Sequence, residues 1–530
     1  TFDGLKFGRV TDRPIVWSFG GPRGARRWWP CKDHPEDKAD RVYIRADVPA
    51  GLELVANGAA VARTPQGDRT VFEWLETAPI ATYLVAIAAY PYSIYEDSYV
   101  PAGPRPEGEP EAMPILFYNY PESRAAWEPV QAKVKDMIAG FAEPFGEYPF
   151  LHEKYGHAQV PFAGGMEHQT ITSLGNSGEL VVAHELAHQW WGDEITCADF
   201  HDVWLNEGFA TYAEALWLEQ TQRIERYHAH MENAQFFGAG TIYVPEVSDP
   251  DRVYHPRLSY AKGAWVLHML RHVVGDEDFF EILRAFRARQ RDLFGGVART
   301  EDLATVASEV AGRDLHPFFR RWIGGAGADS VNQGYPIYRY DWSASPAGPA
   351  WEVSLRVRQM QAGPLFPMPI DVEIWTGADL RDTTLVVENA AADTTYTLTV
   401  LDEPRTVLLD PDQWILRRVL EPMPKLEPRR QILLVNGVGW RGENGAAARD
   451  RYAAQAFTGG LEYDFWDYQP EPDAGYPAGM PRPRGHGEVP GQVLGEYRAV
   501  IWVGNLLDGD DQGFRDSPLH AYLEAGGNLL

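Results

Sequence analysis

The sequence contains little cysteine and no long apolar run. Only Cys31 and Cys197 occur among its 530 residues, so at most one disulfide can form and no cysteine framework holds the fold together. The longest apolar stretch, at residues 83–90, is far shorter than the roughly 20 residues that a helix needs to span a bilayer. Internal repeats of fixed period and low-complexity tracts are absent as well. These absences exclude a disulfide scaffold, a membrane span and a repeat protein.

Basic residues are also fewer than acidic ones. The chain has 48 Lys and Arg against 75 Asp and Glu, which gives a formal net charge of -27. Nucleic acid and anionic membrane surfaces would be repelled, so neither is expected as the main partner. A cationic group on a substrate would be attracted instead. Oligomeric state is left open.

The chain opens at Thr1 with no visible signal peptide, so we expect an upstream segment to be missing. The compartment therefore stays undecided between a cytoplasmic and a secreted or periplasmic location, with a slight lean to the latter.

What is present is typical of a multidomain α+β protein. Short β-branched and aromatic runs at the start of the chain give way to helical periodicity of three and four, then to alternating strands, and finally to an α/β pattern. The expected domains are the C-terminal part of an N-terminal β domain (1–105), a mainly helical domain (106–330), a β-sandwich (331–425) and a partial α/β accessory domain (426–530). The last of these faintly resembles glutamine-amidotransferase-like or flavodoxin-like domains.

The stretch VVAHELAHQW at residues 181–190 carries the chemistry. On a helix, positions i and i+4 lie on one face, so His184 and His188 point the same way, with Glu185 beside them. Two imidazoles so placed can bind one metal ion. A catalytic zinc site has three protein ligands and leaves a fourth position for water, so a third ligand is required.

Glu207 is the candidate for the third ligand. It follows His188 after eighteen intervening residues and opens the apolar helix of VWLNEGFATYAEALW. A carboxylate in the first turn of such a helix is costly to bury unless it is paired or bound to metal. Glu214 lies two helical turns further on the same face, where it could accept a hydrogen bond from a ligand histidine, although an ion pair elsewhere is an alternative. The sequence thus predicts one zinc ion per chain.

The sequence resembles the zinc gluzincin aminopeptidases, the family of aminopeptidase N and the leukotriene-hydrolase-like metallopeptidases. The resemblance covers about residues 1–420, and four motifs carry it in order. They are GGMEH at 164–168, HELAHQWWGD at 184–193, WLNEGFATYAE at 204–214 and SYAKGAWVL at 259–267. It implies a thermolysin-like catalytic domain for the helical part of the chain.

The resemblance also implies roles for individual residues. Glu185 would act as the general base that takes a proton from water and passes it to the leaving amine. Tyr260, in YAKG, would donate a hydrogen bond to the oxyanion. Gly164, Gly165 and Met166 would line the substrate strand.

Glu167 would meet the free α-ammonium of the substrate. Two positions of the sequence depart from the family pattern. The residue after Glu167 is His168, where the family usually has asparagine; an imidazole could alter the pH dependence or hold the strand differently. Gly21 stands where the family commonly has a Gln or Glu that completes the amine clamp, so recognition of the amine is expected to be looser.

The function expected from the sequence is a zinc aminopeptidase acting on peptides with a free N-terminus. Two alternatives stay open. One is a zinc endopeptidase or epoxide hydrolase of the same fold. The other is a catalytically silent zinc- and peptide-binding scaffold, whose marker would be loss of Glu185 or Tyr260, and both residues are present.

Overall fold

The computed structural model describes residues 4–22, 24–103, 111–324, 334–377 and 381–422, and most of 426–530. In the last stretch the described residues are 426, 428, 430–440, 442–454, 459, 461–469, 472, 475–487, 489–504 and 518–530. The expected domain boundaries at 105/106 and 330/331, and residue 425 at the third, lie outside the described residues. No described helix is long and apolar enough to cross a membrane.

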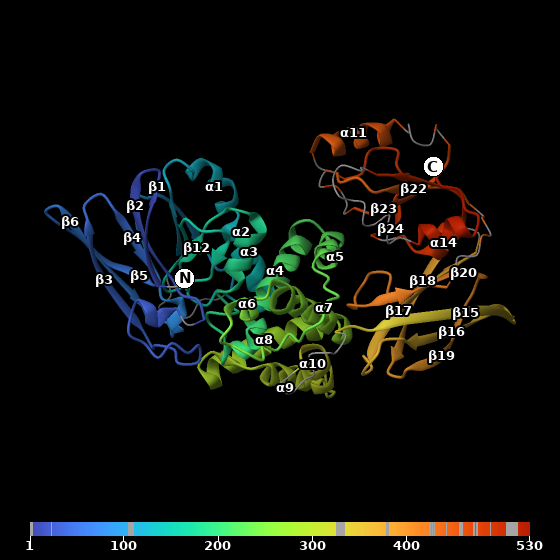
Figure 1. The fold of residues 1–530 in the computed structure, drawn as a ribbon, viewed down its shortest axis with the longest axis horizontal. Helices are drawn as coiled ribbons and strands as arrows, with labels where there is room; N and C mark the ends of the chain where they lie inside the picture. Colours follow the sequence, from blue (N-terminus) through green and yellow to red (C-terminus); the bar gives the residue numbers. More distant parts are fainter. Residues whose placement is uncertain are drawn as a thin grey trace. The chain divides into compact units, whose positions relative to one another are not determined.

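The chain divides into two compact units (Figure 1). The first comprises Thr1–Trp217 and Gly240–Ser330, and the second comprises Leu218–Ala239 and Val331–Leu530. Both combine sheets and helices, which confirms the multidomain α+β fold.

The N-terminal part of the first unit is built from sheets, as its β-branched and aromatic runs predict. One sheet has the order β1-β2-β7-β4 and another the order β3-β6-β5. Their strands are β1 (Gly4–Val10), β2 (Arg13–Phe19), β3 (Val42–Pro49), β4 (Glu53–Ala56), β5 (Ala59–Gln66), β6 (Arg69–Glu76) and β7 (Ile87–Tyr90). The short 3-10 turns are Ala25–Arg27, Thr82–Leu84 and, later in the unit, Phe200–Asp202.

A mixed five-stranded sheet, β11-β12-β10-β9-β8, follows. Its strands are β8 (Ser93–Tyr99), β9 (Met113–Asn119), β10 (Tyr155–Gln159), β11 (Gly165–Met166) and β12 (Thr172–Leu174). β10 is parallel to both β9 and β12, whereas the terminal strands β8 and β11 are antiparallel to their neighbours. The short strand β11 therefore forms one edge of this sheet and carries part of GGMEH.

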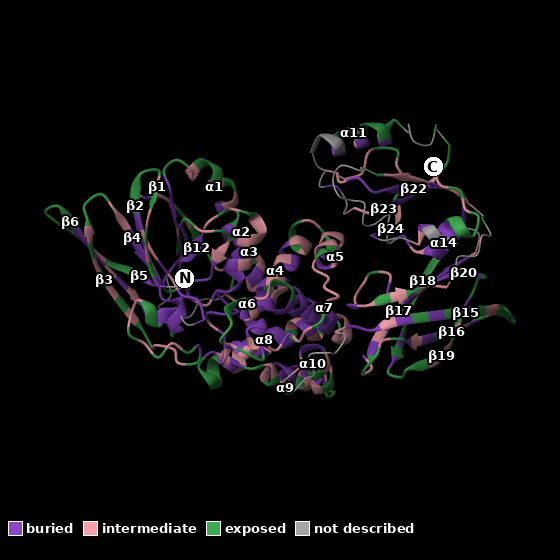
Figure 2. Cartoon of the chain, viewed as in Figure 1, coloured by how far each residue is buried: buried purple, intermediate pink, exposed green. Residues whose placement is uncertain are grey.

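Helices make up the rest of the first unit. They are α1 (Arg124–Gln131), α2 (Val134–Phe145), α3 (Glu179–Ala187), α4 (Trp204–Thr221), α6 (Pro250–Val253), α7 (Gly263–Val274), α8 (Asp276–Phe294), α9 (Thr300–Val310) and α10 (His316–Ile323), with a small parallel pair β13 (Thr196–Cys197) and β14 (Val297–Ala298). The first turns of α4 are buried almost all round (Figure 2). A helix that is apolar on every side lies inside the domain, and this places Glu207 in a region sheltered from water.

The second unit contains a two-sheet β-sandwich and a parallel α/β part. The sandwich sheets have the orders β19-β16-β15-β21 and β18-β17-β20. Along β16 the residues Val353, Leu355 and Val357 are buried while their neighbours are more exposed, as a sheet with one covered face requires. The strands of the sandwich are β15 (Ile337–Ala347), β16 (Ala350–Gln359), β17 (Met368–Thr376), β18 (Arg381–Asn389), β19 (Asp393–Val400), β20 (Pro404–Leu409) and β21 (Arg418–Leu420).

The parallel sheet near the end of the chain has the order β24-β23-β22-β25. Its strands are β22 (Arg430–Asn436), β23 (Asp464–Asp467), β24 (Pro483–His486) and β25 (Tyr497–Val503), and the helices of this unit are α5 (Ile224–Asn233), α11 (Gly442–Ala453), α12 (Gly491–Gly495) and α14 (Leu519–Glu524). A parallel sheet with helical connections is the α/β pattern that the sequence predicts for this segment.

Candidate active site

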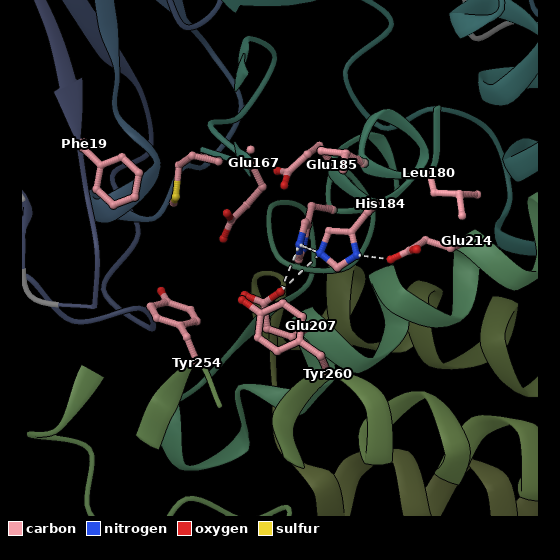
Figure 3. A pocket seen from close by; sticks show the side chains of 14 residues that line it. Phe19, Glu167, Leu180, His184, Glu185, Glu207, Glu214, Tyr254 and Tyr260 are labelled. Atoms are coloured by element: carbon pink, nitrogen blue, oxygen red, sulfur yellow. Dashed lines mark hydrogen bonds and ion pairs between the residues drawn. The ribbon is translucent and has the colours of Figure 1, made fainter. Parts of the chain in front are cut away.

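A cavity of about 370 Å³ opens in the first unit, where the end of β2, the edge strand β11 and the helices α3 and α4 meet (Figure 3). Every site residue predicted from the sequence lines it: Gly164, Gly165, Met166, Glu167, His184, Glu185, His188, Glu207, Glu214 and Tyr260. The structure therefore gathers residues from four separate motifs around one space.

The three predicted metal ligands converge. His184 Nε2 and His188 Nε2 lie 3.1 Å apart, and Glu207 Oε2 lies 3.4 Å from the first and 3.3 Å from the second. A tetrahedral zinc ion with bonds of about 2.0–2.1 Å sets its ligand atoms about 3.3–3.4 Å apart. The triangle of donor atoms thus has the size that zinc requires.

The hydrogen-bond partners of the two Nδ1 atoms determine the tautomers of His184 and His188. His184 Nδ1 lies 2.9 Å from Glu214 Oε1, and His188 Nδ1 lies 3.0 Å from the carbonyl oxygen of Trp191. Because a carboxylate and a carbonyl only accept hydrogen bonds, both Nδ1 atoms donate, and in the neutral imidazoles both Nε2 atoms present lone pairs. Two lone pairs that face each other at 3.1 Å repel unless a cation lies between them. The donor set therefore fits a zinc ion.

Glu214 orients the ring of His184, so its loss should weaken metal binding. We expect Glu214→Ala to lower zinc affinity by about 10- to 100-fold, because the imidazole loses the partner that fixes its tautomer and its orientation. Competition with a chromogenic chelator measures the affinity. Glu219→Ala, further along α4 and outside the cavity lining, is the matched control. Equal zinc affinity in the Glu214 variant and the wild type would contradict this role.

Glu185 points into the cavity but is not one of the three metal donors. Its side chain is buried and Oε2 has no hydrogen-bond partner in the protein. Burial raises the pKa of this carboxyl to about 8, although the nearby His184 and His188 act to lower it. A bound zinc ion would also act to lower that pKa. A buried carboxylate with a free oxygen is placed to handle a proton.

Gly165 makes room for Glu185. A Cβ atom at position 165 would lie 2.3 Å from Glu185 Oε1, which is far inside van der Waals contact. Only glycine lets the edge strand β11 approach Glu185 so closely.

The carboxylate of Glu167 reaches the same space from the loop after β11 (Figure 3). Burial raises the pKa of Glu167, and the side chain is only 5% exposed. Glu167, Glu185 and His188 each offer an atom within 4.8 Å of the others. A positively charged partner would stabilise the ionised form of a carboxyl group buried in such a place.

The loop that carries Glu167 is held by the N-terminal sheets. Asn57 Nδ2 donates to the carbonyl oxygen of Gln169 at 2.7 Å, and the Gly58 amide donates to Thr170 Oγ1 at 2.8 Å. Thr170 has a φ of 63°, a left-handed conformation that a non-glycine residue adopts only at a cost. These contacts span about 112 positions of sequence and fix the loop from a distant part of the chain.

His168 acts as a neutral support. Burial lowers the pKa of its imidazole to about 3, and Nδ1 lies 2.9 Å from Ser173 Oγ on β12. Of the two effects that the sequence left open for this residue, the contact with the neighbouring strand is the one that the structure displays.

Tyr260 lies in a π-helical turn, Pro256–Lys262, a wider winding that often occurs at functional sites. Its ring stacks on that of His184, with centroids 5.9 Å apart and an angle of 10° between the planes. Burial, reinforced by the charge of Glu207, raises the pKa of its phenol well above 10. The hydroxyl therefore stays protonated and able to donate a hydrogen bond.

Four residues that the sequence reasoning did not nominate also line the cavity: Phe19, Leu180, Val181 and Tyr254. Leu180 and Val181 precede His184 on the helix, so the helical period could have placed them. Phe19 comes two residues before Gly21, the position where the sequence suggested an incomplete clamp. Apolar residues carry no local sign that they face a cavity and not the core.

Residues 166–322 match the model of the peptidase family M1 domain. Among relatives, the chain is 27% identical over 398 residues to an aminopeptidase N of Streptomyces lividans, with 67% of this chain and 44% of the relative covered. It is 27% identical over 346 residues to a leucyl aminopeptidase of Saccharolobus solfataricus, with 59% and 41% covered. The chain thus spans less than half the length of these relatives.

Solved structures resemble this chain as well. An aminopeptidase A of Legionella pneumophila in complex with aspartic acid aligns with a TM-score of 0.66 at 19% identity, covering 79% of this chain and 48% of that one, and shows the shared fold. An M1 zinc metallopeptidase of Deinococcus radiodurans aligns with a TM-score of 0.51 at 26% identity, covering 62% and 73%.

Proposed function

Because this chain belongs to the zinc gluzincin aminopeptidase family, we propose that it is a zinc-dependent aminopeptidase that removes N-terminal residues from peptides. The observation that supports this most is the meeting of three metal donors, a Glu185 whose Oε2 atom has no hydrogen-bond partner, and a buried Glu167 in one cavity. The metal site alone would serve any hydrolase; Glu167 adds a place for an ammonium group.

The metal donors, Glu185 and Tyr260 have separate roles in the proposed reaction. His184, His188 and Glu207 would hold a zinc ion, which would supply a Lewis acid that makes water nucleophilic near neutral pH. Glu185 takes the proton of the attacking water and gives it to the leaving amine. Tyr260 donates a hydrogen bond to the carbonyl oxygen as that atom gains negative charge.

Glu167 binds the substrate's free α-ammonium and thereby places the first peptide bond, and no other, against the base. The pairing is strong because the carboxylate is buried and a charge-assisted hydrogen bond gains strength away from water. This favours an aminopeptidase over an endopeptidase, whose substrate brings no charge to this position. Retention of both Glu185 and Tyr260 favours an active enzyme over a silent scaffold.

Blocking the substrate's amine tests the proposal. We expect the wild type to hydrolyse an alanine arylamide at least about 100-fold faster than its N-acetylated form. Glu167→Gln should lower kcat/KM for the free amine by about 10- to 100-fold, since a hydrogen bond to a charged group is worth about 1.5–3 kcal/mol, and should leave the acetylated substrate almost unaffected. Steady-state kinetics on both substrates measure the ratio.

Glu143→Gln, an exposed glutamate on α2, is the matched control and should keep the wild-type ratio. Equal wild-type rates on the free and acetylated substrates would contradict aminopeptidase action and favour the endopeptidase. Absence of turnover with zinc fully bound would favour the scaffold.

A further inference from the structure

One side of the cavity is apolar. Phe19 and Tyr254 lie across from the metal donors, with the carboxylate of Glu167 between the two groups (Figure 3). Met166 precedes Glu167 in the chain and lines the same space. When the ammonium of a substrate meets Glu167 and its carbonyl faces the metal donors, the wall of Phe19, Met166 and Tyr254 is the surface beside Glu167 that can receive the side chain.

The apolar wall is part of the packed interior. The rings of Phe19 and Phe162 lie edge to face, with centroids 5.4 Å apart at 77°. Together with Met166 and Tyr254 they join one hydrophobic cluster of the first unit. Such packing fixes rotamers, so the wall presents a defined surface to a ligand.

The backbone next to Phe19 is fixed too. A Cβ atom at Gly20 would lie 2.1 Å from the carbonyl oxygen of Tyr83, so the chain passes directly against that residue. Phe19 ends β2, which pairs along its length with β1. The N-terminal sheet thus carries this ring to the cavity in one position.

The charges of the cavity argue against an acidic side chain on the substrate. Among the described residues that line the cavity there is no lysine or arginine, while four are glutamates: Glu167, Glu185, Glu207 and Glu214. An acidic side chain would be repelled and left without a partner. A basic side chain would face aromatic and thioether groups, because each glutamate already has a task with the ammonium, the water, the metal or His184.

We propose that Phe19 is a specificity-determining residue that, with Met166 and Tyr254, selects peptides whose N-terminal side chain is large and apolar, above all aromatic. The inference rests on the proposed aminopeptidase function. An aromatic substrate side chain can pack edge to face on Phe19, as Phe162 does from the other side. The sulfur of Met166 adds a polarizable contact.

Arylamides of phenylalanine, leucine, alanine, lysine and aspartate, measured on the full chain, test the proposal. The wild type should show its highest kcat/KM with phenylalanine or leucine and its lowest with aspartate. Phe19→Ala should lower kcat/KM for phenylalanine by about 10- to 100-fold, the range expected when apolar contacts in a pocket are lost, and change alanine by less than about threefold. Phe19→Leu should keep leucine turnover and lose part of the preference for phenylalanine.

Phe7→Ala is the matched control, because Phe7 lies in the neighbouring strand β1 and is 75% exposed. A uniform loss on all substrates in Phe19→Ala, with alanine falling as much as phenylalanine, would overturn the proposal and assign Phe19 a structural role. A wild-type preference for aspartate or lysine would also overturn it, yet would leave the proposed function intact if acetylated substrates remain poor. No turnover of any free arylamide by the zinc-loaded wild type would instead defeat the proposed function and this inference with it.

A binding measurement guards against a variant that folds poorly. The affinity of phenylalaninamide and of alaninamide, measured by calorimetry on the wild type and on Phe19→Leu, reports the same preference without turnover. We expect the ratio of the two affinities to fall by about tenfold in Phe19→Leu. An unchanged ratio would overturn the proposal.

Discussion

Glu185→Gln is expected to lower kcat by at least about 10³-fold while one zinc ion stays bound. Proton transfer by a positioned carboxylate contributes typically about 10²–10⁴-fold, and the amide cannot accept the proton of the attacking water. The substitution keeps the size of the side chain, so the close approach of Gly165 to this position is preserved. Metal content by atomic emission and turnover of an arylamide are the two measurements.

Retained zinc is the critical half of this result, since it separates loss of the base from loss of the site. Glu179→Gln serves as the control, because Glu179 opens the same helix α3 and does not line the cavity. Turnover by Glu185→Gln within about threefold of the wild type would rule out Glu185 as the base. Loss of zinc in this variant would show instead that Glu185 supports the metal.

His188→Ala is expected to remove zinc and activity together. Only two of the three converging donors remain in this variant, and the carbonyl oxygen of Trp191 loses the Nδ1 donor that now lies 3.0 Å away. We expect less than about 0.1 zinc per chain after dialysis and a loss of turnover of at least about 10³-fold. A ligand present at 1,000 times its Kd stabilises the folded state by about 4 kcal/mol, so the variant should also unfold at a lower temperature and lose the response of Tm to added zinc.

His152→Ala is the control for this prediction. His152 is an exposed histidine outside the cavity lining, and its removal should leave zinc content, turnover and the zinc response of Tm unchanged. If His188→Ala held zinc at one per chain through the same dialysis, the three-donor site would be wrong.

The two predictions separate the tasks that meet in one cavity. Glu185→Gln should keep the metal and lose the chemistry, whereas His188→Ala should lose both. Glu167→Gln should keep metal and chemistry and lose the preference for a free amine, and the Phe19 variants should change only which side chain is preferred. Each variant therefore has its own signature across zinc content, turnover and substrate ratios.

The sequence by itself determined the parts of the site that depend on helical geometry. The spacing of His184 and His188 places both rings on one face of a helix because the period is 3.6 residues, and the structure brings their Nε2 atoms to 3.1 Å. The same period carries Glu207 and Glu214 on one face of α4, one toward each end of the His184 ring. The roles of Tyr260 and Glu167 came from resemblance, since nothing local distinguishes them from other tyrosines and glutamates.

Tertiary structure alone decided which apolar residues face the cavity and what holds the loop that carries Glu167. Phe19 reads from the sequence as an ordinary strand residue, and only the packing of β2 against the catalytic part makes it a wall of the site. Asn57 is 112 positions from Gln169, and no sequence period links residues that far apart. Helical contacts are short in sequence and follow from a repeat, whereas contacts between distant strands and loops depend on how the whole unit closes.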